Sequence, residues 1–416
     1  MERPVVTSAA RLLLLLLMLS GLAACASIAR LDPPPPLAAE EAAIFGIPNA
    51  RFMADGPVAP WEQEAAAAAT RRRAADAQAG RVSLPPANYL ALSGGGDNGA
   101  FGAGLLTGWS ESGTRPEFDV VTGISAGALI APFAFLGSAY DPQLRAVFND
   151  VGPGDILVVG RIVTALLFGE AIADASPLYR LIERHADQAM LEAIAREYRR
   201  GRLLLIGTTN LDIRRAVVWN IGAIAASGHP EALGLFRRIL LASASVPGAF
   251  PPVFIDMELE GRRFQEMHVD GGAAMQVFLY PPSLDLRRAA AAWGAQRQRT
   301  AWVVRNGRID VESAPTNRSV FRIARRSVET LLHYSGIADI HRIHLTTTRD
   351  GVAFRLAAIG PDFDAPREGP FDPTFMRALF AYGREQGRSG AAWMDRPPPV
   401  GIIAPDPEPG LTALAP

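Results

Sequence analysis

The sequence predicts an α/β fold with a mainly parallel central sheet. Tyr89–Leu92 is a short apolar strand, which a glycine-rich loop connects to a helix from Ala100 to about Trp109. The β-branched run ahead of Gly123 indicates a second buried strand, and the alanine- and leucine-rich run 126–136 after it has helical spacing. The continuous apolar run 203–207 is typical of a strand covered on both faces. Loops that follow successive strands of such a sheet emerge at one edge.

The composition is that of a globular protein with ample material for a core. Of 416 residues, 49% are hydrophobic and 20% are charged, and the formal net charge is −1. This balance indicates no nucleic-acid partner, although all 41 basic residues are arginines. We expect one catalytic domain at residues 88–395, preceded by a segment at 25–87 and followed by a proline-rich tail at 396–416.

Residues 1–24 have the pattern of a signal peptide. Arg3 and Arg11 precede the apolar run 12–19, which is too short to span a bilayer, and Leu22-Ala23-Ala24-Cys25 follows. This ending resembles the bacterial lipobox, which implies cleavage before Cys25 and lipid attachment to its sulfur. Ala26 then favours the outer membrane, so we expect a chain anchored in the cell envelope and facing the periplasm. The alternative is an ordinary secretory signal in which the single cysteine of the chain is incidental.

Segments around the expected core have less specific patterns. Residues 26–60 are proline-rich and predict a tether, and a helix carrying Arg71, Arg72 and Arg73 is expected at 65–79. The arginine run is either a solvated face or a membrane contact. The apolar run 152–169 is either a buried helix or a lid over an acyl-binding cleft. Residues 178–200 read as one amphipathic helix with His185 at its surface.

The segment VVTGISAGAL at 120–129 predicts a nucleophile elbow. In a G-x-S-x-G turn the serine is held at a sharp bend between a strand and a helix. Gly123 and Gly127 would remove the β-carbons that otherwise clash in this turn. Ser125 is therefore the candidate nucleophile, although the motif alone is common by chance.

The glycine-rich loop SGGGDNG at 93–99 should bind an anion, because backbone N–H groups at a helix start are unpaired. Gly94, Gly96 and Gly99 fit the spacing of a dinucleotide-binding loop, with Asp119 as its acidic residue. A Walker loop is excluded because the chain has no lysine. The third interpretation is an oxyanion hole for acyl transfer. The pairing of this loop with the Ser125 elbow favours the third interpretation.

A predicted hairpin of residues 253–259 and 263–269, with its turn at Glu260-Gly261, delivers Asp270-Gly271-Gly272. An aspartate at a strand end followed by two glycines can reach the same edge of the sheet with little crowding. The alternative is a turn aspartate that caps backbone N–H groups.

Four blocks together resemble the patatin-like phospholipase family over about residues 88–280. They are Gly94-Gly95-Gly96 with Asn98-Gly99, then 123–127, then Ala242–Pro247, then Asp270-Gly271-Gly272. The resemblance implies a three-layer α/β/α fold and a serine acyl hydrolase of the phospholipase A or lysophospholipase type. No cofactor is expected, and no His or carboxylate cluster has metal-ligand spacing, so calcium or zinc dependence is not indicated. The resemblance also implies that Ser125 is the nucleophile, Asp270 the base, and the Gly94–Gly96 loop the oxyanion hole, with Gly95 and Gly96 as donors.

One position departs from the family pattern. Arginine usually stands where this chain has Asn98, and a neutral amide brings no charge to a lipid phosphate. The preference for phospholipids over neutral acyl esters is therefore open.

Two other functions remain open. An α/β-hydrolase with a Ser-Asp-His triad would need His333, His341 or His344 at Ser125, but residues 342–347 read as a strand before a turn at 349–351. His268 shares a strand face with Asp270 and is expected to give support only. The non-enzymatic alternative is a lipid-binding or scaffold lipoprotein on an inert fold.

Further strands are expected at 301–304 and 352–358, and helices at 318–334 and 373–387.

Overall fold

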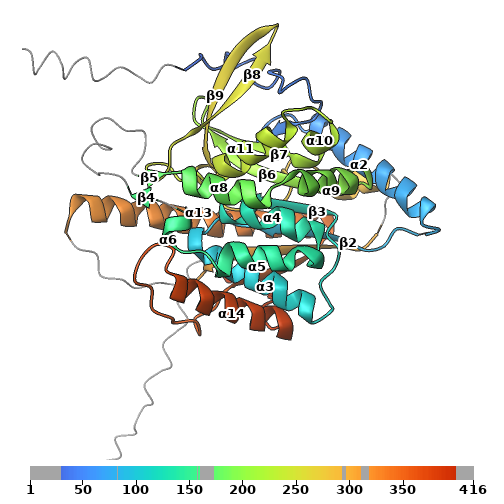
Figure 1. The fold of residues 1–416 in the computed structure, drawn as a ribbon. Helices are drawn as coiled ribbons and strands as arrows, with labels where there is room; N and C mark the ends of the chain where they lie inside the picture. Colours follow the sequence, from blue (N-terminus) through green and yellow to red (C-terminus); the bar gives the residue numbers. More distant parts are fainter. Residues whose placement is uncertain are drawn as a thin grey trace, which may run out of the picture.

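The computed structural model describes residues 30–81, 83–156, 158–159, 173–292, 297–310 and 318–399. A central sheet has helices on both of its sides (Figure 1). Nine of the described strands form this sheet: β1 (Arg51–Met53), β2 (Ala87–Leu92), β3 (Val120–Ile124), β6 (Leu203–Asn210), β7 (Arg215–Asn220), β8 (Val253–Leu259), β9 (Arg262–Asp270), β10 (Arg299–Arg308) and β11 (Ala353–Ile359). The short strands β4 (Val158–Val159) and β5 (Ala173–Asp174) pair with each other.

Five neighbouring strands run parallel, in the order β6, β3, β2, β10 and β11. Beyond β6, the antiparallel strands β7 and β1 extend the sheet. The prediction of a mainly parallel sheet is confirmed. The five parallel strands end at one edge, the carboxyl edge, where the loops after β2 and β3 emerge side by side.

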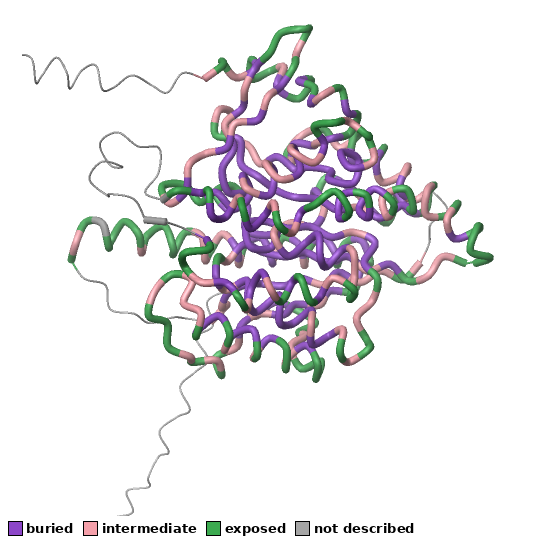
Figure 2. The backbone as a smooth tube through the Cα atoms, viewed as in Figure 1, coloured by how far each residue is buried: buried purple, intermediate pink, exposed green. Residues whose placement is uncertain are grey.

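The helices complete the three layers. On one face of the sheet, Leu90 and Leu92 of β2 pack with Phe101 of α3, and on the other Ala91 packs with Ile340 of α13. Buried residues accordingly run through the middle of the molecule (Figure 2). The described helices are α2 (Ala59–Gln78), α3 (Gly99–Glu111), α4 (Ala126–Leu136), α5 (Asp141–Asn149), α6 (Pro153–Ile156), α8 (Ser176–His185), α9 (Gln188–Arg199), α10 (Ile221–Ala226), α11 (Ala232–Ala244), α12 (Leu286–Ala292), α13 (Val320–Asp350) and α14 (Pro373–Ser389).

The amino-terminal segment is part of the body, so the prediction of a tether over 26–60 is wrong for most of its length. Ile44, Ile47, Phe52 and Met53 are all less than 10% exposed. The strand β1 adds to the sheet beside β7, with Phe52 opposite Val218. The prolines at 33–36 are typical of a tether, but the apolar residues that follow them are packed into the core. Residues 26–29, with Cys25 and the signal peptide, lie outside the described residues.

The prediction of a single helix over 178–200 is corrected, together with the position of His185. The expected helix 178–200 is two helices, because Asp187 caps α9 by accepting the Met190 N–H at 2.8 Å. His185 at the end of α8 is half-buried beside Phe133, not at the surface, and burial lowers its pKa. Of the run 152–169, only 152–156 and 158–159 are described.

The expected strand 342–347 is helical. It belongs to α13, which runs to Asp350 and ends at Gly351 with a left-handed φ of 67°. Burial of Ile340, Ile343 and Thr347 follows a helical spacing, so packing overrides the β-branched composition that suggested a strand.

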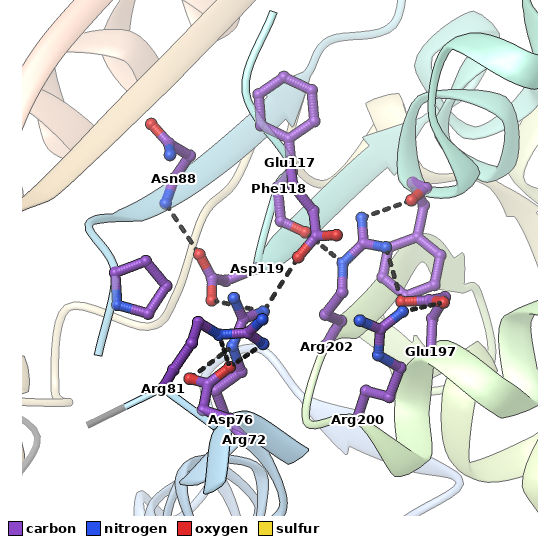
Figure 3. Close-up of polar contacts among 12 residues, drawn as sticks. Arg72, Asp76, Arg81, Asn88, Glu117, Phe118, Asp119, Glu197, Arg200 and Arg202 are labelled. Atoms are coloured by element: carbon purple, nitrogen blue, oxygen red, sulfur yellow. Dashed lines mark hydrogen bonds and ion pairs between the residues drawn. The ribbon is translucent and has the colours of Figure 1, made fainter. Parts of the chain in front are cut away.

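Asp119 lies at the opposite edge of the sheet from the glycine loop. Its carboxylate accepts the Asn88 N–H at 3.0 Å and lies 3.5 Å from Arg72 (Figure 3). It also pairs with Arg297 at 3.0 Å. Strand β3 separates it from Ser125, so it cannot bind a ribose held at the loop and the dinucleotide interpretation is wrong. Arg72 is occupied by this cluster and Arg71 pairs with Glu64 at 2.8 Å, so neither forms a free membrane-contact face.

Candidate active site

Ser125 occupies a strained elbow between β3 and α4. Its φ of 55° and ψ of −124° are rarely adopted by residues other than glycine. A β-carbon at Gly123 would lie 2.4 Å from the Gly127 carbonyl oxygen, and one at Gly127 would lie 2.4 Å from that of Leu92. The serine is only 7% exposed. The sharp turn predicted from the motif is present.

Strand register brings Asp270 to Ser125. Both β3 and β9 pair with the same side of β6, one after the other. Ile124, the last residue of β3, lies opposite Gly207, and Asp270, the last residue of β9, lies opposite Thr208. Because the parallel strand and the antiparallel strand approach from opposite directions, they meet end to end at the carboxyl edge. The residue after β3 is Ser125.

The Asp270 carboxyl is buried and only partly hydrogen-bonded. Its Oδ1 accepts the Gly272 N–H at 2.7 Å, whereas Oδ2 has no well-formed hydrogen bond within the described parts of the chain. Burial raises the pKa of Asp270 to about 6, against opposing effects of the nearby Ser125 hydroxyl and the Gly272 N–H. The turn-capping interpretation of Asp270 is thus true of one oxygen. The other oxygen is unpartnered within the described residues and lies near the Ser125 hydroxyl.

Two serines near the end of α11 hold both groups in place. The Ser243 hydroxyl accepts the Ser125 N–H at 3.0 Å and donates to the Gly207 carbonyl at 2.7 Å. The Ser245 carbonyl accepts the Asp270 N–H at 2.9 Å. The block 242–247 is one of the four sequence blocks, but the sequence does not indicate what its two serines do. Ser243 acts through its hydroxyl and Ser245 through its backbone carbonyl.

The glycine loop passes beside Ser125. A β-carbon on Gly94 would lie 3.2 Å from the Ser125 β-carbon. The Gly94 N–H is donated to the Gln276 carbonyl at 3.0 Å, so Gly94 is corrected from an oxyanion donor to a structural position. No acceptor is found for the N–H groups of Gly95 or Gly96 among the described residues. These two remain the candidate donors.

The comparison with protein families decides the identity of this region. Residues 90–281 match the model of the patatin-like phospholipase family. They form a patatin-like phospholipase domain. The match supports a lipid acyl hydrolase in general terms and does not name a substrate.

Two solved structures are similar to this chain at low identity. One is VipD from Legionella pneumophila, with a TM-score of 0.31 and 12% identity over 75% of this chain and 68% of that one. The other is the type III effector protein ExoU, with a TM-score of 0.19 and 15% identity over 74% of this chain and 54% of that one. TM-scores of this size carry no argument about function. Comparison with curated proteins found no match.

Asn306 holds the glycine loop of the patatin-like domain against the start of α3. It lies near the end of β10, and its side chain donates to the Ser93 carbonyl at 2.8 Å and accepts the Gly102 N–H at 3.1 Å. A β-carbon on Gly95 would lie 2.1 Å from the Asn306 carbonyl oxygen, so only glycine fits there. Nothing in the sequence marks Asn306 as part of the site, because strand β10 lies more than 170 residues beyond Ser125.

Positive charge lies behind the loop although position 98 is not an arginine. Arg305 is 7% exposed, and its Nη1 lies 3.5 Å from the Gln276 side-chain oxygen. Its Nε has no partner among the described residues, and burial lowers its pKa. Beside Asn98, Asp97 pairs with Arg367 at 2.7 Å. Arg305, which lies beyond the matched residues 90–281, therefore places a cation near the loop.

The histidines do not form a triad with Ser125. His268 lies between the Thr208 hydroxyl, 2.9 Å from its Nδ1, and the Glu266 carboxylate, 3.0 Å from its Nε2. Because Thr208 accepts from the Trp219 indole, its hydroxyl donates to Nδ1 and the histidine donates from Nε2. Burial lowers the pKa of His268, so it is neutral and supports the strand that ends at Asp270.

The downstream histidines are on helix α13. The His344 ring contacts Phe354 of β11, with 4.9 Å between ring centroids. Strand β11 is three strands from β3, which is about 14 Å at ordinary strand spacing.

In the described residues, no group of three His, Cys, Asp or Glu side chains could hold a metal. No described helix is long and apolar enough to cross a membrane.

Proposed function

We propose that this protein hydrolyses acyl esters of membrane lipids, as a phospholipase A or lysophospholipase, through a Ser125–Asp270 dyad. The observation that carries the proposal is the end-to-end meeting of β3 and β9 on β6, which puts a strained serine beside a buried carboxyl. The family match at residues 90–281 supports the lipid ester as substrate class.

In the first half-reaction, Ser125 Oγ attacks the ester carbonyl carbon while Asp270 Oδ2 takes the hydroxyl proton. The carbonyl oxygen becomes an oxyanion that the N–H groups of Gly95 and Gly96 stabilise. The tetrahedral intermediate then collapses, the ester C–O bond breaks, and the proton on Asp270 passes to the leaving alcohol oxygen. The acyl group remains on Ser125.

In the second half-reaction, Asp270 takes a proton from a water molecule that attacks the acyl carbon. The fatty acid leaves as Ser125 regains its proton. An aspartate with an ordinary pKa near ~3.9 is a poor base for a serine. Burial of Asp270 raises its pKa to about 6, so its basicity suits proton transfer near neutral pH.

A fluorophosphonate probe tests the proposed nucleophile. The purified full-length chain is labelled in detergent and in buffer, and intact mass is compared with Ser125→Ala and Asp270→Asn. We expect one adduct on the wild type, none on Ser125→Ala, and labelling of Asp270→Asn slowed by roughly 10² to 10⁴-fold. No adduct on the wild type in either medium would favour the inert lipid-binding or scaffold alternative.

We also propose that Cys25 carries the lipid anchor, on the sequence pattern described above. Cys25→Ala should move the protein out of the membrane fraction of a bacterial host that processes lipoproteins. Unchanged fractionation of this variant would contradict the proposal.

A further inference from the structure

The amino-terminal half of α13, together with residues 318 and 319 ahead of it, extends beyond the sheet as an exposed arm, residues 318–334 (Figure 1). Val320, Ile323, Leu331 and Tyr334 are 79%, 49%, 69% and 59% exposed. Their spacing of three, eight and three residues places all four on one face of a helix with 3.6 residues per turn. Figure 2 shows this end of the helix as mostly exposed. An apolar stripe of this kind favours a partner that covers it.

The other face of the arm is basic. Residues 318–334 include four arginines, at 318, 322, 325 and 326, and one acidic residue, Glu329, which gives +4 − 1 = +3 in a chain whose net charge is −1. Glu329 lies 3.6 Å from Arg325 and 3.5 Å from Arg326. Arg318 and Arg322 are exposed. The arm thus combines an apolar face with a basic one.

The same helix is fixed to the candidate active site. Asp339, one turn past the arm, accepts the backbone N–H groups of Gln276 at 2.6 Å and Val277 at 3.3 Å. Gln276 in turn accepts the Gly94 N–H at 3.0 Å. Gly336 packs against the Arg305 guanidinium, where a β-carbon would lie 2.9 Å from Cζ. The position of the arm therefore determines how a surface bound to it meets the glycine loop.

We propose that residues 318–334 dock onto a bilayer that contains anionic lipid, with the apolar face at the level of the acyl chains and the arginines at the phosphates. An amphipathic helix with arginines on its polar face binds such an interface, and long arginine side chains reach the phosphates from its flanks. Charge selects this occupant, because a second copy would bring another arm of charge +3. The inference rests on the proposed function in that membrane lipids are the substrate.

The test places one fluorescent label on each face of the arm. In a full-length Cys25→Ser background, Leu331→Cys and Glu329→Cys each provide the single thiol for bimane. Each protein is mixed with vesicles of phosphatidylcholine alone or with phosphatidylglycerol, both containing a nitroxide-labelled lipid. We expect quenching at position 331 on phosphatidylglycerol vesicles and much less at position 329, its matched control on the opposite face.

Charge is tested by adding Arg318→Gln and Arg322→Gln to the Leu331→Cys protein. We expect the apparent affinity for phosphatidylglycerol vesicles to fall roughly tenfold or more, because each basic residue near an anionic surface contributes to binding. Equal quenching at 331 and 329, or binding that ignores both charge changes, would overturn the proposal. A change of the 331 signal with protein concentration in the absence of lipid would assign the face to a second copy instead.

Enzyme assays separate this inference from the proposed function. Ile323→Glu with Leu331→Glu should lower hydrolysis of vesicle lipid roughly tenfold or more, while hydrolysis of a water-soluble short-chain ester stays within about twofold of the wild type. Vesicle hydrolysis as fast as wild type would contradict docking through this face. A wild type that binds vesicles but cleaves neither substrate would contradict the proposed function and leave docking supported.

Discussion

Asp270 is the residue whose protonation should set the pH dependence of the reaction. It can accept the serine proton only as a carboxylate, and burial raises its pKa to about 6. We predict that kcat/KM for a soluble ester falls about tenfold per pH unit below about pH 6 and is level above it. The check is a rate profile from pH 4.5 to 8.5, in which full activity at pH 5 would contradict the assignment of Asp270 as base.

The same shift predicts that the ionised carboxylate destabilises the fold. The folded pKa of about 6 lies above the ordinary 3.8, so this group's contribution to stability is complete below pH 3.8 and is lost as pH rises through 6. Two pKa units correspond to at most ~3 kcal/mol. Asp270→Asn, which still accepts the Gly272 N–H, should raise the free energy of unfolding at pH 8 and change it little at pH 4.

Denaturant titrations at the two pH values measure this difference. Equal destabilisation of Asp270→Asn at pH 4 and pH 8 would mean that the carboxylate is structural. The combination expected here, a more stable protein with almost no turnover, is typical of a catalytic group that the fold holds at a cost in stability.

Ser243 and Ser245 offer a matched pair for testing how the elbow is held. Ser243→Ala leaves the buried Ser125 N–H without its acceptor, and should cost about 1–3 kcal/mol of stability and lower kcat more than it changes KM. Ser245→Ala keeps the backbone carbonyl that accepts the Asp270 N–H. It loses only the hydroxyl that donates to the Leu241 carbonyl in the last turn of α11. The two variants are compared by thermal unfolding and by the kinetics of ester hydrolysis. Equal effects of both substitutions would contradict the role of the Ser243 hydroxyl in holding the Ser125 elbow.

At the scale of elements, the β2–α3 loop depends on β10. Asn306→Ala removes the acceptor of the Gly102 N–H and the donor to the Ser93 carbonyl, both buried. We predict a loss of about 1–3 kcal/mol for each group left unpaired, and slower fluorophosphonate labelling as the loop shifts. Asn88→Ala is the comparison, because Asn88 bonds the Trp302 indole from the other end of β2. Labelling as fast as wild type would show that the loop holds its own shape.

How far the sequence predicts these elements depends on whether the signal is local. The elbow at Ser125 is readable because Gly123 packs against Gly127 within the same motif. The loop at 94–99 is readable as a run of glycines, although the residues that its glycines meet, such as Asn306 at Gly95, lie elsewhere in the chain. Asn306 and Ser243 are not readable, because each acts on a segment more than 100 residues away in sequence. The helical state of 342–347 was missed for a related reason, since packing on the sheet decides it.

At the scale of the whole molecule, the amino-terminal segment connects to the site through one buried chain of contacts. Arg51 of β1 pairs with Glu266 at 2.5 Å, and Glu266 accepts from His268, two residues before Asp270 on β9. Arg51 and Glu266 are both buried, so removing one partner leaves an uncompensated charge. Residues that the sequence suggested as a tether thus support the strand that ends at the Asp270 carboxyl.

Two truncations test this dependence. A chain that begins at Arg30 keeps β1 and should unfold at the temperature of the full-length protein. A chain that begins at Pro57 loses Ile44, Ile47, Phe52 and Met53, each of which contributes about 1.5–3 kcal/mol by burial, together with Arg51. That sum is comparable with the ~5–15 kcal/mol stability of a whole protein, so the shorter chain should be unfolded or aggregated. Thermal unfolding and light scattering measure both. A folded and active chain from Pro57 would restore the tether hypothesis, because only a segment outside the core can be removed without loss of stability.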